Sequence, residues 1–391
     1  MVHGSRNTPA VRDLFLLRPG LVFLNHGSFG ACPRPVFEAY QRWQLELEQQ
    51  PVEFLGRRSR ELLRTARRAL GQEVGADPDD LVYVPNATTG VNVVARSLDL
   101  QPGDEVVGTD HEYGAVDRTW RTVCAERGAR YVRAAVPVPV HAPGEVADRI
   151  WSAVTRRTRV LAVSHITSPT ALTFPLAELI GRARSSGILT VVDGAHAPGQ
   201  IPIDLRELGA DFYAANCHKW LCAPKGTGFL FARRDLQDRL RPPITSWGDE
   251  SDLAGPSHFL NEFEWQGTDD LAAYLAVPEA IRFLHDHDWG GVRERSHALV
   301  RTFRDALAVL TGLGPLCPDD PAWFTQMASM PLPIPAEEAR AFQRRLLEEF
   351  AIEIPVMRWN GRALLRISVQ AYNTPQDVDA LVRAAGRLLR T

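Results

Sequence analysis

The sequence lacks a surplus of positive charge and lacks any long apolar run, and these two absences exclude several classes of protein. Its 44 Lys and Arg residues are balanced by 47 Asp and Glu residues, which leaves a formal net charge of −3. Proteins that bind nucleic acids or anionic membranes carry basic patches, so we expect neither kind of partner. No stretch reaches the roughly 18 consecutive apolar residues of a membrane-spanning helix.

Cysteine is also scarce. The five cysteines are scattered along the chain, at positions 32, 124, 217, 222 and 317. An odd, scattered set in a long chain is not a disulfide framework, and these thiols are too isolated from other ligand types to predict a metal site. The first residues, MVHGSRNTPAVRDLF, lack the basic start and apolar stretch of a signal peptide. We therefore expect a cytoplasmic protein with no bound metal.

The composition that remains is that of a folded globular protein. Hydrophobic residues make up 45% of the 391 positions and charged residues 23%. This balance excludes disorder, and the length allows two or three folding units around a large buried core.

The middle of the chain alternates short apolar runs with amphipathic stretches. The runs are rich in Val and aromatic residues, and several are apolar on both faces, as in a sheet that is covered on both sides. The expected strands are 81–85, 104–110, 129–136, 159–166, 188–195, 211–217 and 226–232. Strand–helix alternation of this kind predicts an α/β fold with a mostly parallel, seven-stranded sheet and helices on both faces.

The flanking regions divide the chain further. We expect an N-terminal segment over residues 1–20, a large domain over 21–270, and a connecting helix with a smaller C-terminal α+β domain over 271–391. Residues 33–72 and 270–311 have helical patterns, with a break at Trp289–Gly291, and the segment 312–335, rich in Pro and Gly, is expected to be a linker. The small domain should contain helices at 336–350 and 375–390 and strands at 352–359 and 363–372.

Two residues at the ends of neighbouring strands carry the strongest chemical signal. Asp193 ends an apolar strand, and Lys219 follows the next strand, in the segment ANCHKWLCAPKGTGFLF. A carboxylate can keep a pyridine nitrogen protonated, and an amine can form a Schiff base with an aldehyde. Those are the two requirements of pyridoxal phosphate (PLP), whose protonated ring acts as an electron sink.

The sequence resembles the class V aminotransferase family of fold-type-I PLP enzymes, and most closely its isopenicillin N epimerase-like branch. The resemblance spans residues 21 to about 385 and rests on motifs that recur in order. They are LNHGSFG (24–30), NATTGVN (86–92), DHEYGA (110–115), VDGAHAPG (192–199), HKWLCAPKGTGFL (218–230), WQGTDD (265–270) and LRISVQAYNT (365–374).

The resemblance implies roles for residues around the cofactor ring. Lys219 matches the Schiff-base lysine, Asp193 matches the partner of the pyridine nitrogen, and His196 matches the position that contacts the ring hydroxyl. An aromatic ring should stack on the cofactor from the segment Asp110–Tyr113. His111 and Tyr113 are both candidates for this position, and the one that does not stack could transfer protons.

The resemblance also implies a phosphate site and a second subunit. The phosphate would lie at Ala87, Thr88 and Thr89, where backbone amides at a helix start and hydroxyl groups make an anion site. Two further positions match phosphate ligands, His218 and, with a less regular match, Asn216. Thr268 matches a residue that reaches the phosphate of the neighbouring subunit, which implies a homodimer with shared active sites.

The remaining matches concern the substrate. Arg366 matches the arginine that binds the α-carboxylate of an amino acid, a task for which a planar, bidentate guanidinium is suited. Asn25, His26 and Ser28 match a loop at the edge of the substrate pocket, and His26 and Tyr113 are candidate acids beside the catalytic Lys219.

The motifs favour an epimerase or racemase, in which Lys219 removes the α-proton from one face of an amino acid and a second acid returns a proton on the other face. The first alternative is a carbon–sulfur lyase that acts on a cysteine S-conjugate or sulfoxide. A cysteine desulfurase is less favoured, because it needs a cysteine shortly before the arginine strand and EIPVMRWNGRALLRIS has none. Aminotransfer and a non-catalytic PLP-binding protein remain lesser alternatives.

Overall fold

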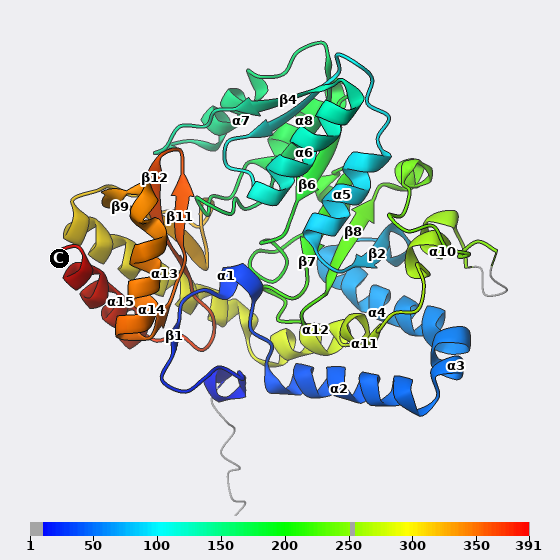
Figure 1. The fold of residues 1–391 in the computed structure, drawn as a ribbon, viewed down its shortest axis with the longest axis horizontal. Coiled ribbons are helices and arrows are strands. Elements are labelled where there is room, and N and C mark those ends of the chain that lie inside the picture. Colours follow the sequence, from blue (N-terminus) through cyan, green and yellow to red (C-terminus); the bar gives the residue numbers. More distant parts are fainter. Residues whose placement is uncertain (1–10, 251–254, 391) are drawn as a thin grey trace, which may run out of the picture.

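A computed structural model describes residues 11–250 and 255–390, and its centre is a seven-stranded sheet (Figure 1). The strand order is β2-β8-β7-β6-β5-β3-β4, and β8 alone runs antiparallel to its neighbours within this sheet. The strands are β2 (Leu81–Val84), β3 (Glu105–Thr109), β4 (Arg130–Ala134), β5 (Thr158–Ser164), β6 (Leu189–Asp193), β7 (Phe212–Asn216) and β8 (Gly228–Ala232). The sequence prediction of a mostly parallel, seven-stranded α/β sheet is therefore confirmed.

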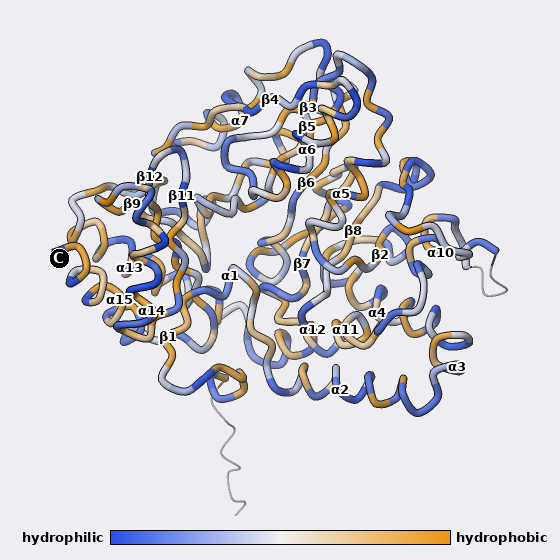
Figure 2. Tube along the Cα trace, viewed as in Figure 1, coloured by the Kyte–Doolittle hydropathy of each residue, from blue (hydrophilic) through white to orange (hydrophobic). Residues whose placement is uncertain are grey.

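Helices cover both faces of this sheet because its central strands are apolar on both sides. On β5, Val160 and Ala162 face one hydrophobic cluster, while Leu161 and Val163 face the other. The first cluster includes buried residues of α5 (Ala87–Ser97) and α6 (Gly114–Arg127), and the second includes those of α7 (Pro143–Trp151) and α8 (Leu176–Ser185). Figure 2 shows the apolar strands enclosed between these helices.

A group of helices lies along the lower edge of the sheet in Figure 1. Its main members pack against one another, and they are α2 (Arg34–Gln49), α4 (Ser59–Val74), α11 (Ala272–Leu275) and α12 (Val277–Asp286). Shorter elements nearby are α1 (His26–Phe29), α3 (Pro51–Glu53), a π-helical turn (Phe54–Arg58), α9 (Leu205–Leu208) and α10 (His258–Glu264). Four 3-10 turns complete the set at Val11–Leu14, Pro78–Asp80, Arg234–Arg239 and Ala336–Glu338.

The C-terminal part builds a second, smaller sheet in the order β11-β12-β9, with antiparallel pairing throughout. Its elements are α13 (Trp289–Thr311), β9 (Met327–Pro335), α14 (Ala339–Phe350), β10 (Ile352–Glu353), β11 (Val356–Trp359), β12 (Arg362–Ser368) and α15 (Pro375–Leu388). The N-terminal strand β1 (Val22–Phe23) pairs in parallel with β10. The first described residues therefore contact the C-terminal elements, and the segment 1–10 of the expected N-terminal region lies outside the described residues.

One local expectation was wrong, and a second was correct in kind but slightly displaced along the chain. The proposed linker 312–335 contains the strand β9, whose three prolines are tolerated because β9 is an edge strand that pairs only with β12 in its sheet. The expected helix break at Trp289–Gly291 lies slightly earlier: α12 ends at Asp286 and α13 begins at Trp289, because Asp288, at a φ of 48°, caps α13 by accepting a hydrogen bond from the Gly291 amide.

The described helices include none with both the length and the apolar character that a membrane crossing requires.

Candidate active site

A cavity of about 800 Å³ opens where several strands of the large sheet end. Its lining includes the turn after β2, the ends of β5, β6 and β7, and the segment that contains Lys219. Ligand sites of α/β sheets gather at such strand ends because the connections there diverge and leave a crevice.

Lys219 and Asp193 line this cavity together. Burial lowers the pKa of Lys219 to about 8, although the charge of Asp193 opposes this shift by favouring the ammonium form. Burial raises the pKa of Asp193, while the Ala195 amide, which donates to Asp193 Oδ1 at 2.9 Å, and the charge of Lys219 favour the carboxylate. The site thus holds an amine that deprotonates far more readily than a surface lysine, beside an enclosed carboxyl group.

His196 lies between Lys219 and a buried tryptophan. Its Nε2 is 3.4 Å from the Lys219 amine, and its Nδ1 accepts a hydrogen bond from Trp220 Nε1 at 3.3 Å. Because an indole N–H can only donate, the proton of a neutral His196 is on Nε2 and points toward Lys219. Burial holds the pKa of His196 well below its usual value, so the ring is a neutral donor.

The N-terminus of α5 forms the opposite end of the cavity. The Ala87 amide donates to Asn216 Oδ1 at 2.8 Å, and the Asn86 side chain accepts from the Thr89 amide at 2.9 Å. Thr88 and Thr89 both line the cavity here. The Ala87 and Thr89 amides are therefore engaged within the chain, so the helix dipole and the remaining donors of the helix start, such as the Thr88 amide and hydroxyl, are what suits this end to a bound anion.

His218 also lines this region, with its ring already engaged. Its Nδ1 donates to the Thr227 carbonyl oxygen at 2.7 Å, because a carbonyl can only accept. Burial lowers the pKa of His218 to about 4. A neutral His218 therefore presents an unprotonated Nε2, and it would donate to an anion only after gaining a proton.

The geometry distinguishes the two candidates for the stacking ring. His111 is fully buried and bonds Thr170 Oγ1 at 2.6 Å and the Val136 carbonyl at 2.7 Å, and it does not line the cavity. Tyr113 lines the cavity and is 46% exposed. The structure therefore favours Tyr113 for contact with a ligand, while the hydrogen bonds of His111 hold the segment between β3 and α6 in place.

His26, expected as a candidate acid, lies behind the cavity wall. Its Nε2 donates to the Lys219 carbonyl at 2.9 Å, and its Nδ1 accepts from the Tyr372 hydroxyl at 2.9 Å. Burial lowers the pKa of His26 to about 3, so both ring nitrogens are committed in the neutral form. This arrangement favours a role in holding the backbone of Lys219 and not in proton transfer to a substrate.

Arg366 is a buried cation on β12 without an acidic partner in the described ranges. Its Nη1 donates to the Ser168 carbonyl at 2.7 Å, and its Nη2 donates to Ser28 Oγ at 3.2 Å. Ser28 in turn donates to Asn25 Oδ1 at 2.5 Å. Among the described residues the Nε of Arg366 has no hydrogen-bond partner, and burial lowers the pKa of the guanidinium to about 10. Ser28 and Ser168 line the cavity and Arg366 itself does not, so the guanidinium lies directly behind these two residues.

Thr268 lies outside the Lys219 cavity of its own chain. It lines a neighbouring cavity of about 430 Å³, which shares Pro85 and Thr89 with the first. Gly267, beside it, has a φ of 121° and turns the chain sharply at this point.

Sequence reasoning assigned no role to several residues of the cavity lining, among them Ser164, Lys225 and Ser168. Ser164 ends β5 in register with Asp193, so the rule that sites gather at strand ends could have found it. Lys225 and Lys219 are the two lysines of the whole sequence, a signal that composition could have provided. Ser168 lies in an irregular loop and carried no recognisable signal.

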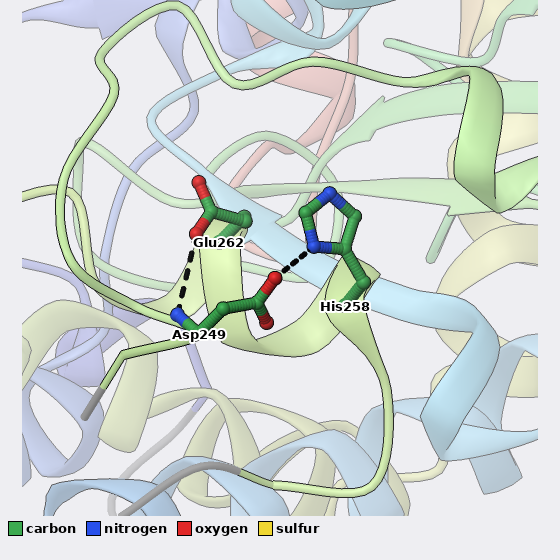
Figure 3. A group of neighbouring side chains, drawn as sticks. All are labelled: Asp249, His258 and Glu262. Atoms are coloured by element: carbon green, nitrogen blue, oxygen red, sulfur yellow. Dashed lines mark hydrogen bonds and ion pairs between the residues drawn. The ribbon is translucent and has the colours of Figure 1, made fainter. Parts of the chain in front are cut away.

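One surface group among the described residues has the side-chain types of a metal site (Figure 3). It consists of Asp249, His258 and Glu262, whose ligand atoms lie within 4.8 Å of one another. Asp249 already bonds both of the others, through its carboxylate to His258 and through its amide to Glu262 at 3.3 Å. The group does not line the Lys219 cavity.

Comparisons with known proteins agree on the family. The model of the family described as Aminotransferase class-V matches residues 30–381. The chain is 38% identical to isopenicillin N epimerase of Amycolatopsis lactamdurans, over 96% of this chain and 97% of that protein. It is 30% identical to a probable chloroplastic L-cysteine desulfhydrase of Arabidopsis thaliana, over 95% and 84% of the two chains.

A solved structure agrees on the fold. The K223A variant of C-DES, with glycine covalently linked to its PLP cofactor, superposes with a TM-score of 0.82 at 23% identity. The superposition covers 97% of this chain and 99% of that one.

Proposed function

The chain belongs to the aminotransferase class-V family and is a PLP-dependent enzyme, and from this premise we propose that it epimerises an amino-acid substrate at the α-carbon. The single observation that carries the proposal is Arg366, a buried guanidinium directly behind the cavity residues Ser28 and Ser168, whose Nε has no hydrogen-bond partner among the described residues.

The residues of the cavity fit PLP. Asp193 offers a carboxylate for the ring nitrogen, the neutral His196 offers an N–H for the ring hydroxyl, and the start of α5 offers amide and hydroxyl donors for the phosphate. Asn216 supports that start by binding the Ala87 amide. When bound, PLP supplies an electron sink that makes the α-proton of an amino acid acidic.

Lys219 is the proposed base at the α-carbon. With a pKa of about 8, a substantial fraction of its amine is neutral near physiological pH and can accept a proton there. Arg366 holds the α-carboxylate and thereby fixes which bond of the α-carbon faces the lysine.

Epimerisation also needs an acid that acts on the other face. Tyr113 is the proposed acid, because its phenol lines the cavity while His26 and His111 do not.

A carbon–sulfur lyase is the second candidate function, favoured by the similarity to L-cysteine desulfhydrases. Lys219 and Arg366 would play the same parts in it, and a sulfur group on the β-carbon would leave instead of a proton returning. The two functions therefore differ in the substrate that the cavity accepts.

A cysteine desulfurase is disfavoured by the hairpin of β11 and β12. Its tip is fixed to the large sheet, because Trp359 Nε1 donates to the Asp110 carbonyl at 2.7 Å and Asn360 Nδ2 donates to Asp110 Oδ2 at 2.6 Å. The hairpin contains no cysteine, so no thiol nucleophile is available there.

Incubation of the holoenzyme with a panel of amino acids and cysteine S-conjugates in D₂O tests this function. We expect α-deuterium incorporation and inversion of chirality for one amino-acid class, without pyruvate. Pyruvate from the S-conjugates, with little inversion of any amino acid, would favour the lyase. Absence of both exchange and pyruvate across the panel would contradict the family of reactions as a whole.

Two variants control this experiment. Lys219→Ala should abolish exchange, and borohydride should no longer fix PLP to the protein. Lys225→Arg keeps the charge at the other lysine and should still allow fixation, because only Lys219 is expected to bond the cofactor. Peptide mapping of the reduced wild-type protein would then show the adduct on Lys219.

We further propose a homodimer with shared active sites. Support comes from Thr268, which lies in the cavity beside the phosphate end, and from large exposed apolar side chains such as Trp247 at 61% and Phe29 at 71% exposure. A partner subunit would cover such side chains.

A further inference from the structure

Glu112 is a buried carboxyl group to which neither the family resemblance nor the proposed reaction assigns a role. It lies in the turn between β3 and α6, between His111 and the cavity residue Tyr113, and is only 8% exposed. Within the described ranges it forms no ion pair with Lys or Arg. Burying a carboxylate without an ion-pair partner costs free energy, because the charge loses its hydration. The presence of a carboxyl group at this position therefore needs a physical explanation.

Two hydroxyl groups hold the Glu112 carboxyl group in place. Thr109 Oγ1 donates to Oε1 at 2.6 Å, and Ser164 Oγ donates to Oε2 at 2.5 Å. Ser164 is the register partner of Asp193 on the adjacent strand, and both residues line the cavity. Glu112 therefore connects through a single hydroxyl group to the place where the cofactor ring is expected.

Among the groups that face Glu112 from other elements, Asp193 carries the one uncompensated charge. From β6, the carboxylate of Asp193 raises the pKa of Glu112. From β4, the half-buried Tyr131, whose hydroxyl oxygen is enclosed, faces Glu112 as a neutral phenol, because burial and Glu112 both raise the pKa of Tyr131. Behind Tyr131, Asp117 and Arg133 form an ion pair at 3.1 Å and compensate each other.

The remaining neighbours are on the same turn. His111 is kept neutral by burial, which lowers its pKa, and Asp110 accepts hydrogen bonds from the Val136 amide and from Asn360. Burial is the largest influence on Glu112 itself and raises its pKa to about 7, against the hydrogen bonds from Ser164 and Thr109 that favour the carboxylate.

We propose that Glu112 is a positioning residue of the cofactor site, which holds a proton so that Asp193 remains the one charged carboxyl group beside the ring. Two carboxylates enclosed at this site would repel each other, and a proton on Glu112 removes that repulsion without removing the charge that the ring nitrogen needs.

Ser164 transmits the state of Glu112 to the cavity. While Glu112 is ionised, the Ser164 hydroxyl donates to it and presents only lone pairs to the cavity. Once Glu112 takes a proton from solvent, it can donate to Ser164 Oγ, and the Ser164 proton is then free to point into the cavity. The protonation of Glu112 thus decides whether Ser164 acts as an acceptor or a donor toward a ligand.

Infrared difference spectroscopy of the holoenzyme, wild type against Glu112→Gln, tests the proposal directly. We expect the carbonyl stretch of a protonated carboxylic acid at pH 6, which is largely lost by pH 8.5 and is absent from the variant. A spectrum without this signal at pH 6 would overturn the proposal, and so would a signal of the same size in Glu112→Gln, because the protonated group would then be another carboxylic acid.

Two further variants keep the test decisive if Glu112→Gln folds poorly. Thr109→Val and Ser164→Ala each remove a donor that favours the carboxylate, so each should move the infrared midpoint to higher pH by about one unit. In these variants the titration is followed with isotope-labelled glutamate. An unchanged midpoint, or one that moves to lower pH, would contradict the inferred contacts.

The pH dependence of apoprotein stability gives a second readout. Because the pKa of Glu112 is raised in the folded state, its protonated form contributes stability that is fully present below about pH 4.5 and is lost as the pH rises through about 7. The wild type should therefore lose stability relative to Glu112→Gln across this range. Parallel curves for the two proteins would argue against the proposal.

The inference rests on Asp193 serving a PLP ring, but not on the reaction that follows. A protein that binds PLP and shows the infrared titration yet does not epimerise amino acids would leave it standing. Failure of the titration in an active epimerase would overturn this inference alone.

Discussion

At the scale of single residues, sequence and structure agree on which side chains meet but not on all of their directions. Asp193, His196 and Lys219 all line one cavity, as the motifs predicted. His26 and His111 come from two other motifs of the same family pattern, and neither lines the cavity. The direction of a side chain in a turn depends on tertiary partners such as Tyr372 and Thr170, which no local pattern reveals.

The role of Arg366 can be tested by a conservative change. Arg366→Lys should keep the fold and the cofactor but lower kcat/KM roughly 30- to 1000-fold, which corresponds to about 2–4 kcal/mol of transition-state stabilisation. The reason is that lysine offers a point charge and cannot bind a carboxylate with two parallel hydrogen bonds. Steady-state kinetics of amino acids and of amines without a carboxylate would measure this. The loss should be confined to the amino acids.

A matched control lies on the same strand. Arg362 is exposed at the start of β12, so Arg362→Lys should leave both kinds of substrate unaffected. Equal losses for amines and amino acids in Arg366→Lys would show that the residue is structural.

At the scale of elements, prediction succeeded where burial alone determines the structure. Each strand of the large sheet lies within its expected range to about a residue, because residues apolar on both faces have few alternatives to a covered sheet. It failed for β9, whose prolines suggested a linker, since the sequence does not show that an edge position tolerates them. It placed the break between α12 and α13 slightly too late, because Asp288, in the left-handed region, already caps the helix that begins at Trp289.

The loop that begins at Asn25 packs closely against the backbone of the Lys219 segment. Gly30 has a φ of 70°, and a Cβ at this position would lie 2.0 Å from the His218 carbonyl oxygen and 2.9 Å from Lys219 Cα. Both the backbone conformation and the contact therefore require glycine.

Gly30→Ala should lower the free energy of unfolding by at least about 2 kcal/mol and weaken PLP binding, because the Lys219 segment must move to relieve the contact. Denaturant unfolding and PLP titration measure the two effects. Gly181→Ala is the control, because this glycine lies inside α8 with open space around it. This variant should raise the free energy of unfolding by about 0.5–1 kcal/mol. A Gly30→Ala protein with unchanged stability would contradict the supporting role of the loop.

At the scale of the whole molecule, we propose that residues 21–270 and 271–391 form the large and small domains, joined by more than the chain between them. The strand β1 at Val22–Phe23 pairs with β10, and Trp359 on the small sheet binds Asp110 beside the cavity. Arg366 on β12 also reaches Ser168 of the large part. The active site is therefore built between the two parts, which a sequence divided into consecutive segments cannot show.

The proposed homodimer can be tested directly by measuring the oligomeric state in solution. The proposed homodimer should bury more than about 2,000 Å², the range of obligate interfaces, and light scattering should give twice the monomer mass. Thr268→Ala should weaken PLP binding in the dimer, because Thr268 lies beside the phosphate end and outside the cavity of its own chain. A stable monomer that retains PLP on dilution would exclude shared sites.

Mixed dimers decide whether Thr268 acts across the interface. In a dimer of one Lys219→Ala subunit and one Thr268→Ala subunit, the site that keeps Lys219 receives an intact Thr268 from its partner if the contact crosses the interface. That site should then bind PLP with wild-type affinity, at half the wild-type stoichiometry. If Thr268 serves its own subunit instead, the same site carries the alanine and binds as weakly as the Thr268→Ala homodimer. Because each mixed dimer keeps one lysine site in either case, the affinity alone distinguishes the two arrangements.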